Sequence, residues 1–309
     1  MGLDCAAVKF LCGAKSLGVD FAHTIMVGRQ CFYPNYDTLE RISAVLGISR
    51  HAIATLKSSQ FGESFFTLLG AKQVSSLDAS AYEGATYVHD LNLPLPVALL
   101  QRFSVVYDGG TLEHVFNFSQ ALKNCMEMVH VGGHFVQGSV ANNFMGHGFW
   151  QLSPELLYRV FTPHNGYRIE AVVLHEVVPG GAWYAVQNPD DALQRVELCN
   201  SAPTYIFCIA RRVALTEIFA KSPQQGDYVA AWAGRGWEAP VPEPTGLRRM
   251  IPSRLRQLVP QPMKYLLSRT LRRLSPYNAT FYRRIEEDDL LRGRMSFSSQ
   301  YPSSPMMRS

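Results

Sequence analysis

The sequence predicts an α/β fold built on a parallel sheet. In the stretch 103–140, an apolar, β-branched and aromatic run stops abruptly at Asp108, Gly109 and Gly110, as a buried strand does when it ends in a tight turn. Apolar residues then recur at helical spacing to about Val129, and a Gly-Gly pair precedes a second apolar run. Strand, turn, helix and strand in this order indicate a parallel sheet, whose ligands bind at the carboxyl ends of the strands.

Other segments supply the rest of such a sheet. Short apolar runs predict further strands, at 24–27, 167–175 and 204–213, and two more short strands are expected at 74–78 and 85–88. Helical spacing and capping residues predict the helices between them, at 4–17, 36–46, about 62–69 and from Ser153-Pro154 onward. Two helices are expected between the strands at 24–27 and 74–78, because that interval is long for a single crossover.

Composition indicates one large domain with an appendage. The chain has 309 residues, of which 47% are hydrophobic, which is enough to bury a core. Proline and glycine punctuate the chain from Ser222 onward, so we expect a first domain at 1–221 and an extension at 222–309. Between Leu247 and Met295 there are twelve Lys or Arg against four Asp or Glu, so the extension is basic. Helices are expected within it at 264–274 and 277–291, before a frayed end.

The cysteines and the hydropathy pattern narrow the class of protein. Six cysteines form no C-x-x-C pair and no tight Cys/His spacing, so neither a zinc site nor a disulfide framework is expected. No apolar run approaches the roughly 20 residues that span a bilayer, and the start lacks the pattern of a signal peptide. We therefore expect a cytoplasmic protein without a transmembrane segment or bound metal. No oligomeric state follows from the sequence.

A family resemblance emerges around the central stretch. The strand that ends at Asp108, the following Gly-Thr-Leu-Glu-His-Val, the helix and the Gly-Gly pair resemble the second half of a class I S-adenosylmethionine-dependent methyltransferase. The segments 74–78 and 85–92 resemble the second strand and the third strand with its adenine-side turn. The similarity covers about 24–213. It implies a Rossmann-like, seven-stranded, mostly parallel sheet with helices on both faces and two final antiparallel edge strands.

The resemblance also implies S-adenosyl-L-methionine as cofactor and assigns residues to it. Asp78 would bind the ribose hydroxyls and Asp90 the adenine side, while the amino-acid part would lie near the other residues of this set, which are Gly28, Arg29, Asp108, Gly109, Gly110, Glu113 and His114. Each acid also has a structural reading, since Asp78 could cap a turn and Glu113 could favour a helix dipole. Arg29 could instead bind an acidic substrate group or form a surface ion pair. At the first turn, Met26–Gln30, one glycine stands where the family usually has two or three.

The loop after the predicted fifth strand supplies the acceptor side. His147 is the candidate general base, because an imidazole titrates near neutrality; alternatively it satisfies backbone groups of its loop. Polar and aromatic residues suited to sugars or other polyols are candidates for the acceptor pocket, namely Asn142, Asn143, Phe149, Trp150 and Gln151. The aromatic ones could instead belong to the core of the next helix.

The predicted function is methyl transfer from S-adenosylmethionine to oxygen or nitrogen of a small molecule or glycan. One alternative is a methyltransferase-like binding or scaffolding module without catalysis, suggested by the single glycine of the first turn. A second alternative is an RNA methyltransferase that uses the basic tail for phosphate contacts. It is less favoured, because the predicted domain shows no basic patch with interleaved aromatic residues, and a solvated helical face is the commoner meaning of such a tail.

Overall fold

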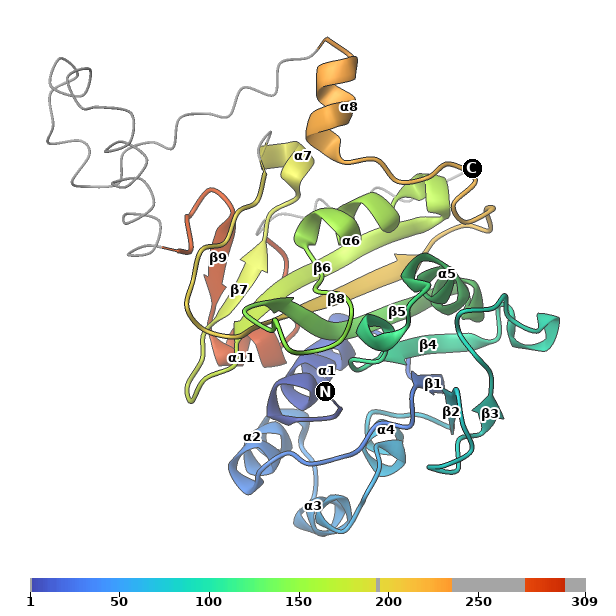
Figure 1. Ribbon diagram of the computed structural model, residues 1–309. Helices are drawn as coiled ribbons and strands as arrows, with labels where there is room; N and C mark the ends of the chain where they lie inside the picture. Colours follow the sequence, from blue (N-terminus) through green and yellow to red (C-terminus); the bar gives the residue numbers. More distant parts are fainter. Residues whose placement is uncertain (1, 193–194, 235–275, 298–309) are drawn as a thin grey trace, which may run out of the picture.

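A computed structural model describes residues 2–192, 195–234 and 276–297 (Figure 1). Within them the chain forms a nine-stranded sheet with helices packed against it. The strands are β1 His23–Val27, β2 Gln73–Asp78, β3 Tyr87–Val88, β4 Phe103–Asp108, β5 Val129–Asn142, β6 Tyr167–Glu176, β7 Trp183–Val186, β8 Thr204–Arg212 and β9 Tyr282–Ile285. The α-helices are α1 Cys5–Leu17, α2 Tyr36–Leu46, α3 Arg50–Lys57, α4 Glu63–Leu68, α5 Phe118–Met128, α6 Pro154–Val160, α7 Pro189–Ala192, α8 Gly226–Trp232 and α11 Glu287–Leu291. Short 3₁₀ helices are η1 Val97–Leu99, η2 Leu112–His114 and η3 Pro163–Asn165.

The strand order is β3-β2-β1-β4-β5-β8-β6-β7-β9. Strands β1 to β5 pair in parallel, whereas β8 runs antiparallel to both β5 and β6, and β7 and β9 add two antiparallel pairs. Strands β2 and β3 lie on one side of β1, and the chain then crosses to β4 on the other side. The order therefore reverses between β1 and β4, which is the topological switch point where open α/β sheets bind ligands.

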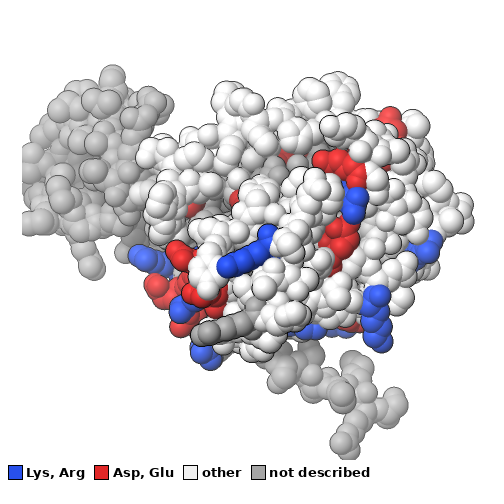
Figure 2. Space-filling view, turned by 90° about the horizontal axis from the view of Figure 1, so that it is seen from below, with Lys and Arg blue, Asp and Glu red and all other residues white. Residues whose placement is uncertain are grey.

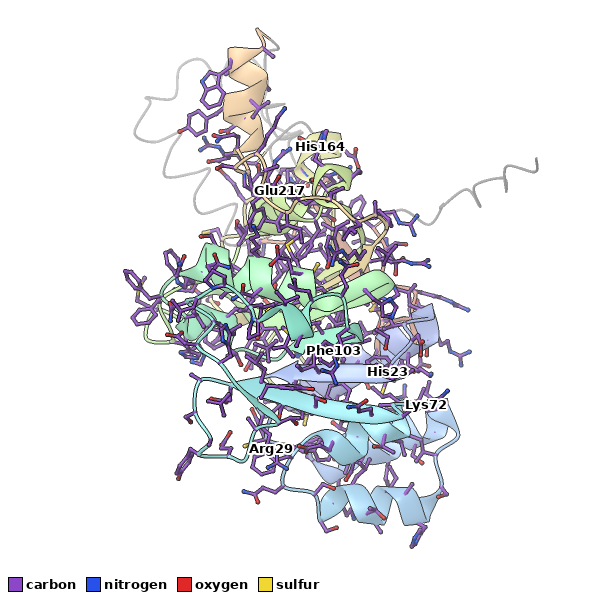
Figure 3. All side chains as sticks on the ribbon, turned by 90° about the vertical axis from the view of Figure 1, so that its right-hand side faces the viewer. His23, Arg29, Lys72, Phe103, His164 and Glu217 are labelled. Carbon is purple, nitrogen blue, oxygen red and sulfur yellow. The ribbon has the colours of Figure 1, made fainter. Side chains whose placement is uncertain are left out.

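The strands at the switch point end at the same edge of the sheet. Val27 of β1 pairs with both Leu77 of β2 and Asp108 of β4. Figure 3 labels three residues at or next to the starts of these strands, and they are His23, Lys72 and Phe103. Arg29, which follows β1, lies at the opposite end (Figure 3). The residues after β1, β2 and β4 thus share one edge.

The predicted number of seven strands is wrong, because the sheet has nine. Four of its eight neighbouring strand pairs are antiparallel, so the sheet is mixed. The expected strands are confirmed, with β6 and β8 antiparallel to each other. However, β7 and β9 extend the sheet beyond β6, so β6 and β8 do not form its edge. Each added strand has only four residues, which is too short for a periodic pattern to stand out.

The helix predicted over 277–291 is also wrong, because β9 occupies its middle and only Glu287–Leu291 is helical. Tyr282 and Ile285 of β9 are buried, and β9 pairs with β7 about a hundred residues earlier in the chain. The neighbouring arginines and acids resemble a charged helix in sequence, and the strand forms because pairing and burial outweigh local preference. The helix predicted at 264–274 lies outside the described residues.

Two further details differ from expectation. The Gly132-Gly133 pair lies inside β5 and does not close α5, which ends at Met128. A Cβ on Gly133 would lie 2.7 Å from the carbonyl oxygen of Ser104, so this glycine permits the close approach of β4. Three helices connect β1 to β2, and the unpredicted one is α3.

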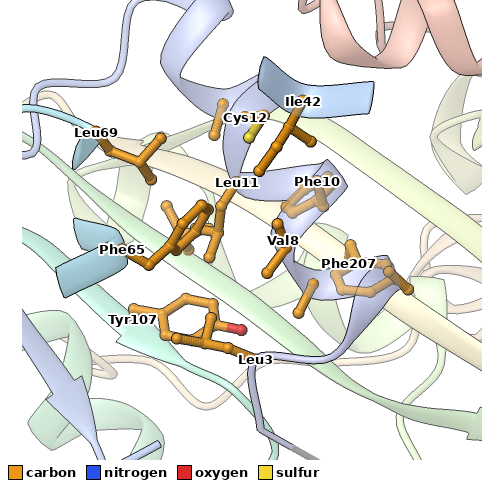
Figure 4. Close-up of a cluster of buried hydrophobic side chains, with 14 of the residues drawn as sticks. Leu3, Val8, Phe10, Leu11, Cys12, Ile42, Phe65, Leu69, Tyr107 and Phe207 are labelled. Atoms are coloured by element: carbon orange, nitrogen blue, oxygen red, sulfur yellow. The ribbon is translucent and has the colours of Figure 1, made fainter. Parts of the chain in front are cut away.

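An apolar core lies on each face of the sheet. On one face, side chains from α1, α2, α3, α4 and α11 pack on the strands. Figure 4 shows part of this cluster, with Phe65 of α4 near Tyr107 of β4 and Phe10 of α1 beside Phe207 of β8. On the other face α5 and α6 cover the sheet, with Leu122 in the same cluster as Val106. Helices therefore cover both faces, as predicted.

The last described segment packs on the first helix of the chain. Lys9 Nζ lies 2.7 Å from Glu287 Oε2, and Ser16 Oγ donates a hydrogen bond of 2.7 Å to the carbonyl oxygen of Leu291. Figure 2 views the molecule from below relative to Figure 1 and shows acidic and basic side chains interspersed on that face. The division at Lys221 stays a prediction, although β9 and α11 join the part after it to the sheet. Among the described helices, none is both long and apolar enough to cross a bilayer.

Candidate functional site

The candidate site begins at the turn after β1. Gly28 has a φ of 71°, in the left-handed region. A Cβ there would lie 2.6 Å from Thr111 Oγ1, so the glycine lets the turns after β1 and β4 meet. Thr111 Oγ1 in turn donates a hydrogen bond of 2.7 Å to the carbonyl oxygen of Val27. The carboxyl ends of the two strands at the switch point are thereby joined.

Gln30, which sequence analysis did not single out, fills the space between these turns. Its side chain is 6% exposed, and Nε2 donates hydrogen bonds to the Val27 carbonyl oxygen at 2.6 Å and to Thr111 Oγ1 at 3.2 Å. A Cβ on Gly109 would lie 2.7 Å from Gln30 Oε1. An amide side chain therefore packs where the resembled family has further glycines. In the sequence it stands out only by its position two residues after Gly28, which gives no sign of its contact with Thr111.

Arg29 is engaged within the fold. Its Nε lies 2.7 Å from Glu63 Oε1 of α4, and one terminal nitrogen donates a hydrogen bond of 2.6 Å to the carbonyl oxygen of Glu83. The guanidinium also lies 4.2 Å above the centre of the Phe61 ring. Arg29 thus ties α4 to the loop after β2, and its role as a ligand for the cofactor carboxylate stays a prediction.

Asp78 and Asp90, the two acids assigned to the nucleoside, differ in burial and in their hydrogen bonds. Asp78 is half-buried at the end of β2, and its Oδ1 accepts a hydrogen bond of 3.2 Å from Ser80 N. A carboxylate accepts about four such bonds, so Asp78 can accept further hydrogen bonds. Asp90 Oδ1 accepts from both the backbone and the side-chain nitrogen of Asn92, at 2.9 and 2.7 Å. These bonds lower the pKa of the exposed Asp90 carboxyl.

Asp108 is completely buried and holds the turn that follows it. Its Oδ1 accepts hydrogen bonds from Thr111 N at 2.8 Å and Leu112 N at 3.4 Å, and Oδ2 accepts one from Gln137 Nε2 at 2.9 Å. Burial and the nearby Glu113 raise the pKa of Asp108 to about 7. Any contact of this residue with a cofactor would therefore come from its backbone.

Glu113, His114 and His147 come together beside η2. Glu113 is completely buried, and its Oε2 accepts a hydrogen bond of 3.0 Å from Ser139 Oγ. Glu113 Oε1 lies 3.6 Å from His147 Nε2, and the two imidazole rings meet nearly edge to face with centroids 4.8 Å apart. Burial raises the pKa of Glu113 and lowers the pKa of both His114 and His147. Both imidazoles are therefore neutral near pH 7.

Backbone contacts hold the loop of His147 over η2. Phe149 N and Trp150 N donate hydrogen bonds to the carbonyl oxygen of Glu113 at 2.7 and 3.2 Å. Gly148 has a φ of 66°, and a Cβ there would lie 2.8 Å from that same oxygen. His147 thus sits above Glu113 because a glycine lets its loop approach. Sequence analysis selected these residues separately, and the structure brings them together.

The other acceptor-side candidates divide into two groups. Asn142 and Asn143 turn toward Asn200, with side-chain contacts of 2.8 and 3.1 Å to its Oδ1, so they brace the loop before β8. Gln151 Oε1 accepts a hydrogen bond of 3.2 Å from Phe144 N. By contrast, Phe149 and Trp150 are exposed, and Phe149 meets the exposed Phe116 edge to face at 6.0 Å. These rings form an aromatic surface beside the loop of His147.

Two cavities lie away from these residues. One of about 330 Å³ is lined by α1, β7 and the start of α11, and another of about 730 Å³ lies between α6, β6 and Phe297. Neither contains a site residue predicted from the sequence. The candidate site is instead an open edge of the sheet.

No protein-family model matches the chain, and no curated protein matches it in sequence. Solved structures that it resembles include a methyltransferase of Thermotoga maritima, with 14% identity, TM-score 0.34, and coverage of 65% of this chain and 91% of that one. The 1,6-didemethyltoxoflavin-N1-methyltransferase of Burkholderia thailandensis, solved with S-adenosylhomocysteine, has 12% identity, TM-score 0.36, and coverage of 67% and 79%. A 16S rRNA adenine methyltransferase of Catenulisporales acidiphilia has 13% identity, TM-score 0.34, and coverage of 66% and 91%. At this identity and TM-score the likeness concerns the fold, and no site residue is transferred from it.

Proposed function

We propose that the chain is an S-adenosylmethionine-dependent methyltransferase that methylates oxygen or nitrogen of a small molecule or glycan. The observation that carries the proposal is the meeting of the β1, β2 and β4 turns at the switch point, with Asp78 at one end and the His147 loop at the other. A nucleoside and an acceptor can approach such an edge from opposite sides.

The residues present fit the nucleoside half of this cofactor. Asp78 has a half-buried carboxylate with acceptor capacity beyond its bond to Ser80, as two ribose hydroxyls require. Asp90 follows β3, where the adenine is expected. Gly109 and Gly110 would line the amino-acid part, next to the Gln30 amide. When bound, S-adenosylmethionine supplies an already activated methyl group, so alignment of the acceptor contributes much of the catalysis.

His147 is the proposed catalytic residue on the acceptor side. Its Nε2 is buried against Glu113, so Nδ1 is the nitrogen that could take a proton from an acceptor. The lowered pKa leaves the ring neutral and able to accept one. The exposed rings of Phe149 and Trp150 suit stacking against a sugar or another flat, partly apolar acceptor.

Titration with S-adenosylhomocysteine tests the cofactor part. We expect one site per chain, and Asp78→Ala should weaken binding by about 1–3 kcal/mol through loss of charged hydrogen bonds. Asp191→Ala is the matched control, because Asp191 is an exposed acid on α7, away from the site. A folded protein without detectable binding would contradict the proposal. A screen of alcohols, sugars and amines for production of S-adenosylhomocysteine then tests turnover.

A binding or scaffolding module without catalysis is the second candidate. The observation in its favour is the first turn, where Gln30 and Arg29 are both engaged in contacts within the protein. This candidate predicts a folded chain that neither binds S-adenosylhomocysteine nor produces it. An RNA methyltransferase is less favoured, because acidic and basic side chains mix on the face that Figure 2 shows. RNA binding that weakens steeply with salt would support it.

The proposed setting is the cytoplasm. All six cysteines are free, including the exposed Cys31, as expected in a reducing compartment. The half-buried and buried thiols pack as small apolar groups within the fold.

A further inference from the structure

One carboxylate and two imidazoles meet where β4 leads into η2. The ligand atoms of Glu113, His114 and His147 all lie within 4.8 Å of one another. We propose that these three side chains bind a divalent transition-metal ion. The sequence did not suggest this site, because the spacing from His114 to His147 matches no short metal-binding motif, and only the fold brings the residues together.

The separation of the two buried ligand atoms fits a shared ion. Glu113 Oε1 and His147 Nε2 lie 3.6 Å apart, which is too far for a hydrogen bond. Two ligand atoms that are each about 2.1 Å from a zinc-like ion, at an angle of about 120°, lie roughly 3.6 Å apart. Both atoms are buried, and neither has a hydrogen-bond partner among the described residues. A rotation of the exposed His114 ring would bring the third ligand within reach.

The surrounding residues hold the ligands as metal sites require. Ser139 Oγ bonds Glu113 Oε2 at 3.0 Å, which leaves Oε1 directed at His147. The bonds from Phe149 N and Trp150 N to the Glu113 carbonyl oxygen fix the loop that carries His147. Such supporting contacts orient metal ligands, and their loss typically costs about 10–100-fold in affinity. Glu113 and His147 are therefore held in place before any ion arrives.

The donors define the class of ion. Two neutral imidazoles and one carboxylate suit zinc, iron(II) or manganese better than magnesium or calcium, which prefer oxygen ligands alone. Three protein ligands leave at least one position open, and His114 is exposed. If the proposed function is correct, this open position faces the acceptor. With an ion on Nε2, Nδ1 of the neutral His147 ring carries the proton, so the general-base role proposed above applies to the chain without the ion. Binding of the ion does not depend on methyl transfer.

Calorimetric titration of the full chain with Zn²⁺, in a Cys31→Ser background that removes the exposed thiol, tests the proposal without any cofactor. We expect one ion per chain. His147→Ala should weaken binding by more than about 100-fold and Ser139→Ala by about 10–100-fold. His164→Ala is the control, because this exposed histidine in η3 is not a member of the cluster, and it should leave the affinity unchanged.

Co²⁺ provides a second readout. Visible absorption bands without the near-ultraviolet transition of a thiolate are expected in the Cys31→Ser chain, and they should disappear in Glu113→Gln or His114→Ala. If Glu113→Gln fails to fold, the variants His114→Ala and His147→Ala still test whether these side chains bind the ion. Zinc binding that is equally strong in His147→Ala, or equally weakened in His164→Ala, would overturn the proposal. No S-adenosylhomocysteine is present in these metal titrations. A negative result would therefore contradict the metal site only, and the methyltransferase proposal is tested separately by the titration with S-adenosylhomocysteine.

Discussion

At the scale of single residues, the buried Asp108 makes the stability of the fold depend on pH. Its pKa is raised from 3.8 to about 7, first by burial and then by Glu113. The native state therefore keeps a proton that the unfolded chain releases near pH 4. Because the native state binds more protons in this window, stability falls as pH rises from about 4 to 7. Glu113, whose pKa is also raised, acts in the same direction.

Asp108→Asn should remove most of this dependence. The Asn oxygen can accept the bonds from Thr111 N and Leu112 N, and the Gln137 amide can turn so that its Oε1, which lacks a described partner, accepts from the new NH₂ group. We expect stability similar to the parent at pH 5 and higher by roughly 1–3 kcal/mol at pH 8. Urea unfolding at both pH values measures this. A larger gain at pH 5 than at pH 8 would reverse the sign and contradict the raised pKa.

The residues of the site were predictable to different degrees. Asp108 follows an apolar run directly, so its place at the carboxyl edge follows from local sequence, whereas Asp78 follows Val74-Ser75-Ser76-Leu77 and was placed there by the family resemblance. Gln30 and Ser139 gain their roles from partners more than twenty residues away, and a polar residue near or inside an apolar run carries no local sign of such a partner. The predicted acceptor roles of Asn142 and Asn143 are untested, but the structure directs both side chains at Asn200.

At the scale of elements, the loop 143–151 depends on one backbone conformation. Gly148 combines a φ of 66° with a predicted Cβ contact of 2.8 Å to backbone, whereas a Cβ on Gly146 would have no neighbour within 4 Å in the described structure. The two glycines flank His147. Replacing each by alanine therefore distinguishes the general effect of losing a glycine in this loop from the clash of a Cβ with the backbone of Glu113.

Gly148→Ala should therefore displace the loop from η2 and lower stability by about 1–3 kcal/mol. Gly146→Ala should change it by less than about 0.5 kcal/mol. Thermal unfolding of both variants measures the difference, and zinc titration shows whether His147 has moved. Equal effects of the two substitutions would mean that the close approach of Gly148 to Glu113 does not hold the loop.

Element prediction succeeded where local pattern and tertiary context agree. Strands β1 and β4 were recognised because each is an apolar run that ends at a turn residue, and α2 because its apolar residues recur at helical spacing. Strand β2 was expected from the family resemblance. Strand β9 was assigned to a helix, because its Arg283 and Arg284 lie among acids at helical spacing. Its partner β7 lies about a hundred residues earlier in the sequence. The local spacing of apolar and charged residues contains no information about that pairing.

At the scale of the whole molecule, the last described segment of the chain supplies the edge strand of the sheet. Strand β9 pairs along β7 from Trp183 to Val186, and α11 packs against α1. Gly13 of α1 is needed for that contact, since a Cβ there would lie 2.3 Å from the Leu290 carbonyl oxygen. The basic extension therefore contributes to the core of the first part, which its composition did not indicate.

We expect a chain that ends at Lys221 to be much less stable than one that ends at Phe297. The shorter chain lacks six buried apolar side chains of the described segment, which are Phe281, Tyr282, Ile285, Leu290, Leu291 and Met295. Each fully buried apolar side chain contributes about 1.5–3 kcal/mol, so their loss approaches the 5–15 kcal/mol that stabilises a typical domain. It would also expose Trp183 and the unpaired edge of β7, which favours aggregation. Urea unfolding and sedimentation of the two truncated chains, compared with the full chain, measure these effects. Equal stability of all three would instead show that the part after Lys221 is separable, as the sequence alone predicts.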